Sequence, residues 1–208
     1  QGEACASLKS IDDDHHMKKT TARSKEATHA RIVDAAARAI RRSGYTGTGV
    51  ADIMKDAGLT HGGFYAHFAS REALLVEAAD CAGAESIAAL KQVVTAAPPE
   101  QALQAVMQSY LSKAHLESIE SGCPVAALGS EMPRQALEVR RASTRRIKEM
   151  IDLVARLLPE QESPEAREQA LVIVSSMVGT LLLARAVDDP ALSDSLLESA
   201  LKHFTPNP

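Results

Sequence analysis

The side chains best suited to chemistry lie between positions 60 and 65. Threonine, histidine and tyrosine gather there beside two adjacent glycines, at Thr60, His61, Gly62, Gly63 and Tyr65. Hydroxyl and imidazole groups hydrogen-bond to phosphate oxygens and to the edges of bases. The two glycines cost a helix roughly 1 kcal/mol each, but they would let its backbone approach a duplex closely. This set predicts contact with nucleic acid.

Two short helices joined by a tight turn would have to position these groups. The first helix needs an apolar inner face, which Val50, Ile53 and Met54 supply. Gly58 supplies a turn residue that tolerates a positive φ, and Thr60 can cap a second helix that runs to position 67. This is the plan of a helix-turn-helix, in which the second helix enters the major groove.

Helices are also expected on both sides of this motif. Apolar residues recur at helical spacing from Thr28 to Gly44, and Ser70 can cap a long helix that continues to about Val94. Later helices are punctuated by proline and glycine, at Pro98, Pro99, Gly122, Pro124, Pro133, Pro159, Pro164 and Pro190. Aromatic residues make up only 3% of the chain and β-branched runs are scarce. The predicted fold class is therefore all-α, with about nine helices.

Charge is polarised along the 208 residues, although the formal net charge is only −4. Residues 17–72 hold ten Lys and Arg against five Asp and Glu, whereas residues 73–208 hold twelve against eighteen. A basic segment on an acidic body indicates that one end meets a polyanion. Residues 1–16 are acidic, and the methionine that follows them resembles a natural start, so we expect residues 1–16 to be a leader.

Several functional classes are disfavoured. The three cysteines are far apart and form no CxxC pair, so no zinc site or disulfide framework is indicated and a reduced, cytoplasmic setting fits. The longest uncharged run, residues 169–184, is 16 residues, fewer than the ~20 that a membrane helix needs. No HExxH, GxSxG, Walker loop or dinucleotide fingerprint is present. We expect no enzyme, cofactor, metal or membrane association.

Residues 28–77 resemble the DNA-binding domain of the tetracycline-repressor (TetR) family of bacterial regulators. The motifs that carry the resemblance are Arg31-Ile32-Val33-Asp34-Ala35-Ala36, Gly44-Tyr45, Val50-Ala51-Asp52-Ile53, Ala57-Gly58-Leu59-Thr60, Gly63-Phe64-Tyr65-Ala66-His67-Phe68 and Ser70-Arg71-Glu72-Ala73-Leu74. The family often has lysine where this chain has Arg71, a change that keeps the charge. The rest of the chain is similar to the family in architecture only.

The resemblance implies a ligand-responsive transcriptional regulator, a repressor released from operator DNA by a small apolar or electrophilic molecule. Residues 1–24 show no helical or strand period, and we expect them to form a disordered leader or basic arm. The resemblance implies a helix-turn-helix domain over 25–72 and a ligand-binding and dimerisation domain over 73–208. A ligand would shift the helix from Ser70 to about Val94 and so change the spacing of two recognition helices, which must match half-sites ~34–36 Å apart.

The resemblance also implies roles for single residues. Base edges or adjacent phosphates would be faced by Thr60, His61, Gly62, Gly63 and Tyr65, and phosphates would be contacted by His67, Arg71 and Thr46 or Thr48. Backbone charge contacts could be added by Lys18, Lys19, Arg23 and Lys25. Tyr65 could instead be a packed aromatic, and His67 could satisfy a local carbonyl. The arginine-rich stretch 140–148 is expected to be a solvated helix face.

A ligand pocket in the C-terminal half is implied by the same resemblance, with Met107, Tyr110, Cys123 and Met177 as candidate residues. Methionine suits adaptable apolar pockets, but at helical spacing it is more often plain core. Cys123 precedes Pro124 at the start of a short helix, a place that favours the thiolate. Some similar family members respond to quinones, electrophiles or oxidants. Cys123 either senses ligand or redox state, or is a small buried residue.

The helices near 164–187 and 190–204 are candidates for a subunit interface. Apolar residues cover every side of the first: Leu171, Val172, Ile173, Val174, Met177, Val178, Leu181, Leu182 and Leu183. A helix that is apolar all round is buried all round, either within its own subunit or against a partner. The resemblance implies a four-helix bundle between two subunits, and a homodimer would match a two-fold symmetric operator.

The alternative function is a helical small-molecule-binding or interaction protein that does not bind DNA. Binding to the promoter region of its own gene would discriminate between the two.

Overall fold

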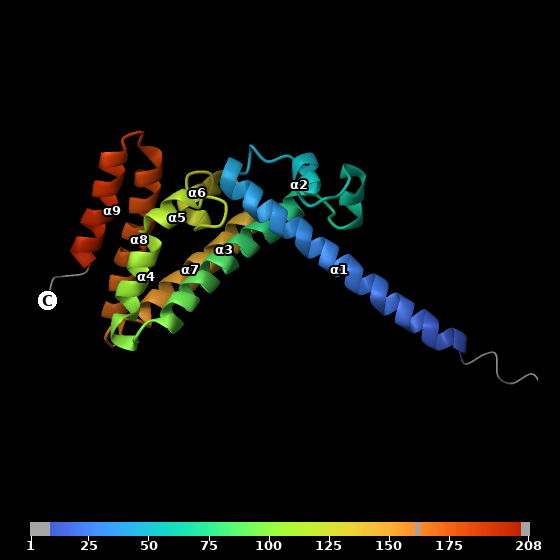
Figure 1. The fold of residues 1–208 in the computed structure, drawn as a ribbon, viewed down its shortest axis with the longest axis horizontal. Coiled ribbons are helices and arrows are strands. Elements are labelled where there is room, and N and C mark those ends of the chain that lie inside the picture. The colour runs from blue at the N-terminus through green and yellow to red at the C-terminus, as the bar shows by residue number, and fades with distance from the viewer. Residues whose placement is uncertain (1–8, 161–162, 205–208) are drawn as a thin grey trace, which may run out of the picture.

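The computed structural model describes residues 9–160 and 163–204, with side chains described from residue 24 onward. Within these ranges every regular element is helical, which confirms the all-α prediction. The elements follow in the order α1 Lys9–Ser43, α2 Val50–Asp56, η1 His61–Ala66, α3 Arg71–Ala96, η2 Pro99–Gln101, α4 Ala102–Tyr110, α5 Lys113–Glu117, α6 Pro124–Leu128, η3 Met132–Arg134, α7 Leu137–Ala155, α8 Pro164–Ala186 and α9 Pro190–Phe204, where η marks a 3-10 helix. Helix α2 lies at one end of the body and α9 at the other, with α3 and α7 between them (Figure 1).

Helix α1 is longer than expected and projects beyond the body of the molecule (Figure 1). We predicted an irregular leader or arm over residues 1–24, and this is wrong for residues 9–24, which are helical. Residues 1–8 lie outside the described residues. Extending an existing helix needs no new nucleation, and an acidic run at positions 12–14 suits the positive end of the helix dipole.

Several predicted helix starts are confirmed by their caps. The Ser70 hydroxyl accepts a hydrogen bond from the Ala73 amide at 3.1 Å, and α3 begins at the next residue. Ser163 caps α8 in the same way, with proline in the first position of the helix. Helix α4 ends at Tyr110, and the Ser112 side chain caps the separate helix α5.

Two hydrophobic cores fill the molecule. The N-terminal core joins α1, α2, η1 and the first half of α3, and the C-terminal core joins the second half of α3 with α4, α7, α8 and α9. The N-terminal core does not stop at position 72, where we placed the domain boundary. It continues through Ala79 and takes in Leu128 from α6 and Val139 and Ala142 from α7. The two halves of the chain are therefore packed together.

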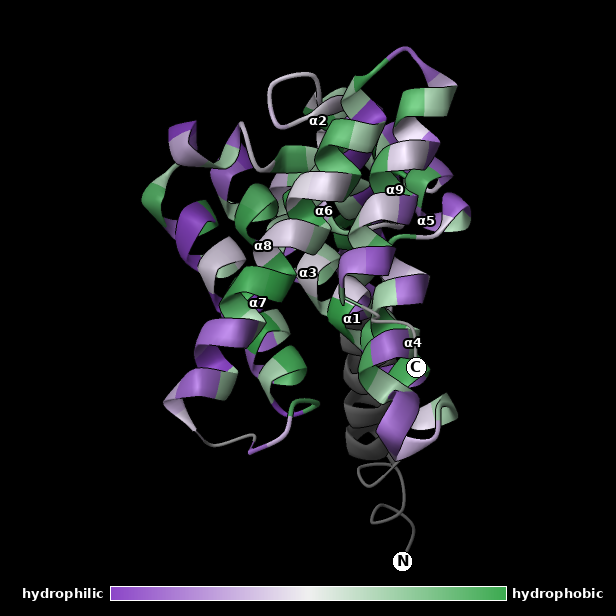
Figure 2. Ribbon diagram, turned by 90° about the vertical axis from the view of Figure 1, so that its left-hand side faces the viewer, coloured by the Kyte–Doolittle hydropathy of each residue, from purple (hydrophilic) through white to green (hydrophobic). Residues whose placement is uncertain are grey.

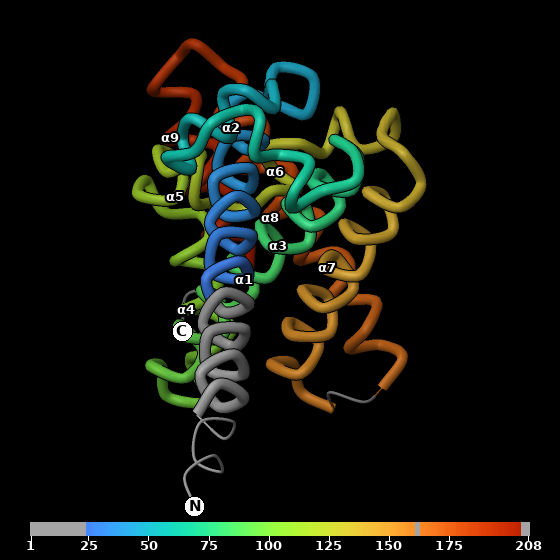
Figure 3. The backbone as a smooth tube through the Cα atoms, turned by 90° about the vertical axis from the view of Figure 1, so that its right-hand side faces the viewer, coloured from blue at the N-terminus to red at the C-terminus, as the bar shows by residue number. Residues whose placement is uncertain are grey.

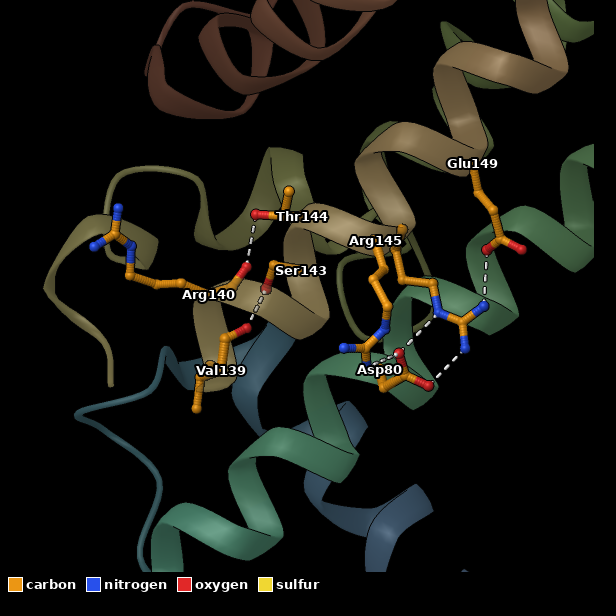
Figure 4. Close-up of polar contacts among 8 residues, drawn as sticks. Asp80, Val139, Arg140, Ser143, Thr144, Arg145 and Glu149 are labelled. Carbon is orange, nitrogen blue, oxygen red and sulfur yellow. Dashed lines mark hydrogen bonds and ion pairs between the residues drawn. The ribbon is translucent and has the colours of Figure 1, made fainter. Parts of the chain in front are cut away.

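Helices α3 and α7 come unusually close at Gly83, where an added Cβ would lie 2.4 Å from Cγ of Arg146. The Asp80 carboxylate lies between the guanidinium groups of Arg145 and Arg146, and Arg146 also contacts Glu149 (Figure 4). Burial would raise the pKa of Asp80, but the hydrogen bonds from both arginines hold it below its usual value. The prediction of a solvated arginine face is therefore wrong for Arg146, which joins α7 to α3.

Candidate nucleic-acid interface and ligand cavity

The turn after α2 is built as its sequence predicts. Gly58 has a φ of +69°, a left-handed conformation that glycine adopts without strain. The amide of Leu59 donates to the carbonyl of Met54 at 2.8 Å and closes the turn. Ile53 and Met54 are fully buried, so their side of α2 packs on the N-terminal core. Local sequence alone therefore determines the angle at which the chain enters the next element.

That next element is η1, a 3-10 helix of six residues, where we predicted an α-helix capped by Thr60. The Thr60 side chain makes no capping hydrogen bond. Gly62 and Gly63 have low helix propensity, and a segment this short gains little from helix propagation, so the tighter 3-10 form suffices. Phe64, only 2% exposed, anchors η1 to the core.

Most of the predicted contact residues are presented to solvent by η1 and the turns beside it. The Tyr65 side chain is 75% exposed and meets the ring of Phe64 edge-on, with centroids 5.2 Å apart. Thr46, Thr60, His61 and Gly62 are also exposed, and Gly63 is half-buried. A Cβ added at Gly62 would meet nothing within 4 Å, so this glycine is not required by the packing of the chain itself. Figure 3 views the molecule from the side that carries α1 and α2.

Two predicted phosphate contacts are instead used inside the fold. The Thr48 side chain is buried, and its hydroxyl bonds to the carbonyls of Ala39 and Gly44. Arg71 donates from Nη2 to the carbonyls of Thr48, at 3.0 Å, and Tyr45. The expectation that these two side chains face phosphates is therefore corrected. They hold the turn between α1 and α2 because its carbonyls have no helical partners.

His67 occupies a partly buried place at the end of η1. Its ring lies 6.2 Å from that of His29, and both line a surface cavity with Lys25 and Glu26. The pKa of His67 is lowered, first by burial and then by the charges of His29 and Lys25. Its Nδ1 has no hydrogen-bond partner, so it does not satisfy a local carbonyl through that atom. Lys25 is exposed, whereas the side chains of Lys18, Lys19 and Arg23 lie outside the described residues.

A second cavity, of about 530 Å³, lies in the other half of the protein between α3, α4 and α5. Tyr110 and Cys123, two of the four predicted ligand residues, line it. Met107 and Met177 are buried in the C-terminal core and are not among the residues that line it, so the plain core interpretation holds for both. Cys123 is 1% exposed, so a reagent reaches its thiol through the cavity.

His115 also lines this cavity. Its Nδ1 lies 2.7 Å from the carbonyl oxygen of Tyr110, and its Nε2 lies 2.9 Å from the amide nitrogen of Cys123. A carbonyl accepts and an amide donates, so His115 carries its proton on Nδ1 and is neutral. Burial lowers its pKa, partly opposed by the bond to the Tyr110 carbonyl and assisted by the charge of Arg185.

Helix α6 connects the cavity to the N-terminal core. It begins after Cys123, which belongs to the C-terminal core, and ends at Leu128, which is fully buried in the N-terminal core. Just before and after it, Glu120 pairs with Arg42, and Glu131 accepts a hydrogen bond from the backbone of Tyr45. A change at the cavity wall therefore has a short path to the turn that precedes α2.

Helix α8 leaves part of its apolar surface uncovered. Val172 and Leu183 are 58% and 51% exposed, and Ser175 and Gly179 continue the same stripe at helical spacing. A Cβ at Gly179 would meet nothing within 4 Å. The end of the molecule that carries α8 and α9 faces the viewer in Figure 2, and apolar residues recur along α8. By length and composition alone α8 could cross a membrane, a test that core helices of soluble proteins also pass.

Cysteine and metal chemistry is limited in the part of the chain that the structure describes. No group of three His, Cys, Asp or Glu residues there is placed to hold a metal ion. Cys81 is half-buried, and burial together with Glu85 raises its pKa to about 11, so its thiol is unreactive.

Comparison with known proteins finds a family model that matches each half of the chain. A model of bacterial regulatory proteins of the tetR family matches residues 32–78, and a model of the C-terminal domain of LmrA/YxaF-like transcriptional regulators matches residues 99–194. The HTH-type transcriptional regulator LmrA of Bacillus subtilis (strain 168) is 28% identical over 160 residues, which are 74% of this chain and 84% of that protein.

Solved structures share the whole fold. The reduced form of E. coli NemR matches with a TM-score of 0.74 and 23% identity, covering 86% of this chain and 95% of that one. A TetR transcriptional regulator from Chloroflexus aurantiacus matches with a TM-score of 0.74 and 25% identity, covering 89% of this chain and 98% of that one.

Proposed function

The chain belongs to the TetR family of bacterial transcriptional regulators, and from this premise we propose that it is a repressor that leaves its operator when a small apolar or electrophilic molecule enters the cavity beside Cys123. The relatives are regulators rather than enzymes, and we expect no catalytic turnover here. Regulators of this family act in the cytoplasm, where we place this protein, associated with the nucleoid when it binds DNA.

The exposed surface of η1 supports the DNA-binding role. Tyr65 stands out from a 3-10 helix whose other side is anchored by Phe64, so the hydroxyl is presented by a rigid support. We assign base-edge or adjacent phosphate contacts to Thr60, His61, Gly62, Gly63 and Tyr65, and phosphate contacts to Thr46 and His67. The basic balance of residues 17–72 supplies the attraction that is independent of sequence.

Ligand entry would act on α3 and α6 together. Leu90 and Val93 on α3 line the cavity, and only four residues separate the end of η1 from the start of α3. A shift of α3 by a few ångström would move η1 and misplace it against a half-site, because two half-sites lie ~34–36 Å apart. The ligand would then lower the affinity for DNA by the same factor by which DNA lowers the affinity for the ligand.

A homodimer through α8 and α9 would supply the second recognition surface. The uncovered stripe of α8 with Val172 and Leu183, together with Leu192 on α9, gives each subunit an apolar face for its copy. An isologous contact of this kind produces the two-fold symmetry of a palindromic operator.

A Cys123 thiol inside the cavity supports a response to electrophiles. Treatment of the protein–operator complex with a quinone should release DNA from the wild type and not from Cys123→Ser, while Cys81→Ser should behave as the wild type. Equal release from the Cys123 variant would contradict a sensing role for this thiol.

The function as a whole is tested by a mobility shift with the promoter region of the protein's own gene. The wild type should bind, Tyr65→Ala should bind at least tenfold more weakly, and Leu137→Ala, which alters an exposed side chain on α7, should bind normally. Failure of the wild type to bind any promoter fragment, or equal binding by Tyr65→Ala, would favour a ligand-binding module without DNA contact.

A further inference from the structure

The wall of the large cavity offers hydrogen-bond donors and carries no acidic residue among the part of the chain that the structure describes. Its polar lining consists of serines, Gln92, Tyr110, His115 and Cys123, and its apolar lining includes Ala89, Leu90 and Val93. An apolar molecule fits the aliphatic side. The kind of polar ligand group that the other end of the cavity binds depends on Tyr110 and on the charge of Arg185 behind the wall.

Tyr110 contributes a buried hydroxyl that has no hydrogen-bond partner of suitable geometry. The residue is only 1% exposed, and the nearest interacting group of its hydroxyl is the Cys123 thiol. A buried hydroxyl without a hydrogen-bond partner destabilises the folded protein. Tyr110 lines the cavity, so an oxygen atom of a bound ligand could accept a hydrogen bond from this hydroxyl and remove the destabilisation.

Arg185 of α8 places a cation behind the same wall. Its Nε and Nη2 donate to the carbonyls of Leu116 and His115, at 3.1 and 2.5 Å, which fixes the guanidinium in place. Its Nη1 is buried and has no partner. Arg185 does not itself line the cavity, but it binds the backbone of His115, which does, and its charge acts on Tyr110 and Cys123. Burial lowers the pKa of this guanidinium, which an anion beside it would reverse.

His115 does not supply a competing charge. Both of its ring nitrogens are used, one by the Tyr110 carbonyl and one by the Cys123 amide, in an arrangement that requires the neutral ring. The polar end therefore combines one fixed cation with donors and no carboxylate. A single carboxylate balances that charge, whereas a phosphate would bring more negative charge than one guanidinium offsets.

We propose that the cavity binds an apolar carboxylic acid as its anion, with the carboxylate accepting a hydrogen bond from the Tyr110 hydroxyl and attracted by the charge of Arg185 behind the wall, and the hydrocarbon lying along Ala89, Leu90 and Val93. This inference rests on the proposed function, in which the cavity holds the inducer, and it names the chemical class of that inducer. Tyr110 and Arg185 are then the residues that determine specificity.

Calorimetry on the full chain at pH 7.5 tests the proposal with three probes of equal chain length: decanoate, decan-1-ol and decylamine. Decanoate should bind at least tenfold more tightly than the alcohol or the amine. Tyr110→Phe should reduce the preference for decanoate over decanol at least fivefold without lowering the melting temperature, because its hydroxyl makes no well-aligned hydrogen bond in the unliganded protein. Arg185→Gln should remove the preference, and Arg167→Gln, an exposed arginine on the same helix, should keep it.

The proposal is overturned if decanoate fails to bind, if decanol or decylamine binds as tightly, or if Tyr110→Phe keeps the full preference. A mobility shift on the same samples separates this outcome from failure of the proposed function. Decanoate that binds with the expected preference but leaves the operator complex intact would contradict the repressor mechanism and not the ligand class.

Discussion

The Glu131 carboxylate accepts a hydrogen bond from the backbone N–H of Tyr45, with 3.0 Å between Oε2 and the nitrogen and 86 residues of sequence between the two positions. Glu131 follows α6, the helix that begins at the cavity wall, and Tyr45 begins the turn that leads to α2. The neighbouring Gly44 has a φ of +75°, and a Cβ there would lie 2.2 Å from Oε1 of Glu131. The carboxylate is therefore seated directly against the turn, and the two halves of the protein meet there.

Glu131→Ala should uncouple the cavity from the DNA-binding surface. The substitution removes a charge-assisted hydrogen bond of about 1.5–3 kcal/mol and leaves the Tyr45 amide without its partner. We expect a lower free energy of unfolding and a smaller ratio of operator affinities without and with inducer, while inducer binding is retained. Fluorescence anisotropy and calorimetry measure the two affinities. Glu138→Ala, which breaks an exposed ion pair with Arg141, is the control, and a wild-type ratio in Glu131→Ala would refute the coupling.

Gly62→Ala should separate stability from DNA binding. Its φ is not positive and the space around it is open, so alanine is accommodated and should raise the free energy of unfolding by up to about 1 kcal/mol. Operator affinity should fall, because the added methyl group keeps the backbone from the duplex. Gly58→Ala, at a φ of +69°, should instead lower stability. Urea unfolding and anisotropy report both quantities, and unchanged operator affinity in Gly62→Ala would rule out close backbone approach.

Arg71→Gln should act through the fold rather than through a phosphate. The variant loses the hydrogen bonds to the carbonyls of Tyr45 and Thr48, so the free energy of unfolding should fall by about 1.5–3 kcal/mol. The slope of log affinity against log salt concentration should match the wild type. A lost phosphate contact would instead reduce that slope by about 1. Operator titrations between 50 and 200 mM salt distinguish a lost phosphate contact from a lost structural hydrogen bond. Arg140→Gln, which changes an exposed arginine, is the control.

His115 should make the protein less stable in weak acid. Its folded pKa lies below the value of about 6.5 for an unfolded histidine, because the ring is buried near Arg185. Above pH 6.5 the His115 ring is neutral in both the folded and the unfolded state. As the pH falls below that value, the ring binds a proton in the unfolded chain before it does so in the folded protein. The free energy of unfolding should therefore drop more between pH 7.5 and 5.5 in the wild type than in His115→Gln. A matching drop in both would contradict this, and His203→Gln is the exposed control.

Val172→Arg should convert a dimer into a monomer. A charge on the uncovered α8 stripe would be desolvated against its symmetry mate, which is costly without a partner. Leu137→Arg introduces the same charge at an equally exposed leucine on α7 and should leave the dimer intact. Light scattering at micromolar concentration reports the mass directly. A wild-type monomer would exclude the proposed interface.

Local sequence was sufficient for features that depend on neighbouring residues. The positive φ of Gly58 and the Ser70 cap of α3 follow from interactions within a few positions, and the spacing of Ile53 and Met54 marks the side of α2 that packs on the N-terminal core. The same local reasoning missed the 3-10 form of η1, because glycine pairs weaken an α-helix without indicating what replaces it. It also missed the length of α1, whose N-terminal residues carry no strong apolar pattern.

The sequence by itself determined the class of the protein: an all-α chain with a basic helix-turn-helix lobe and an acidic helical body, since residue spacing and charge are properties of the linear chain. Only the tertiary structure decided which polar side chains make hydrogen bonds within the folded protein and which remain exposed. Arg71 and Thr48 carry residue types that suit phosphates, yet carbonyls brought together by folding take their hydrogen bonds. His115 and Arg185 meet beside Tyr110 only because α5 and α8, about 70 residues apart, pack together. The sequence shows which chemical group each residue carries, but the groups that bind it come from segments that are distant in the sequence and are brought together by folding.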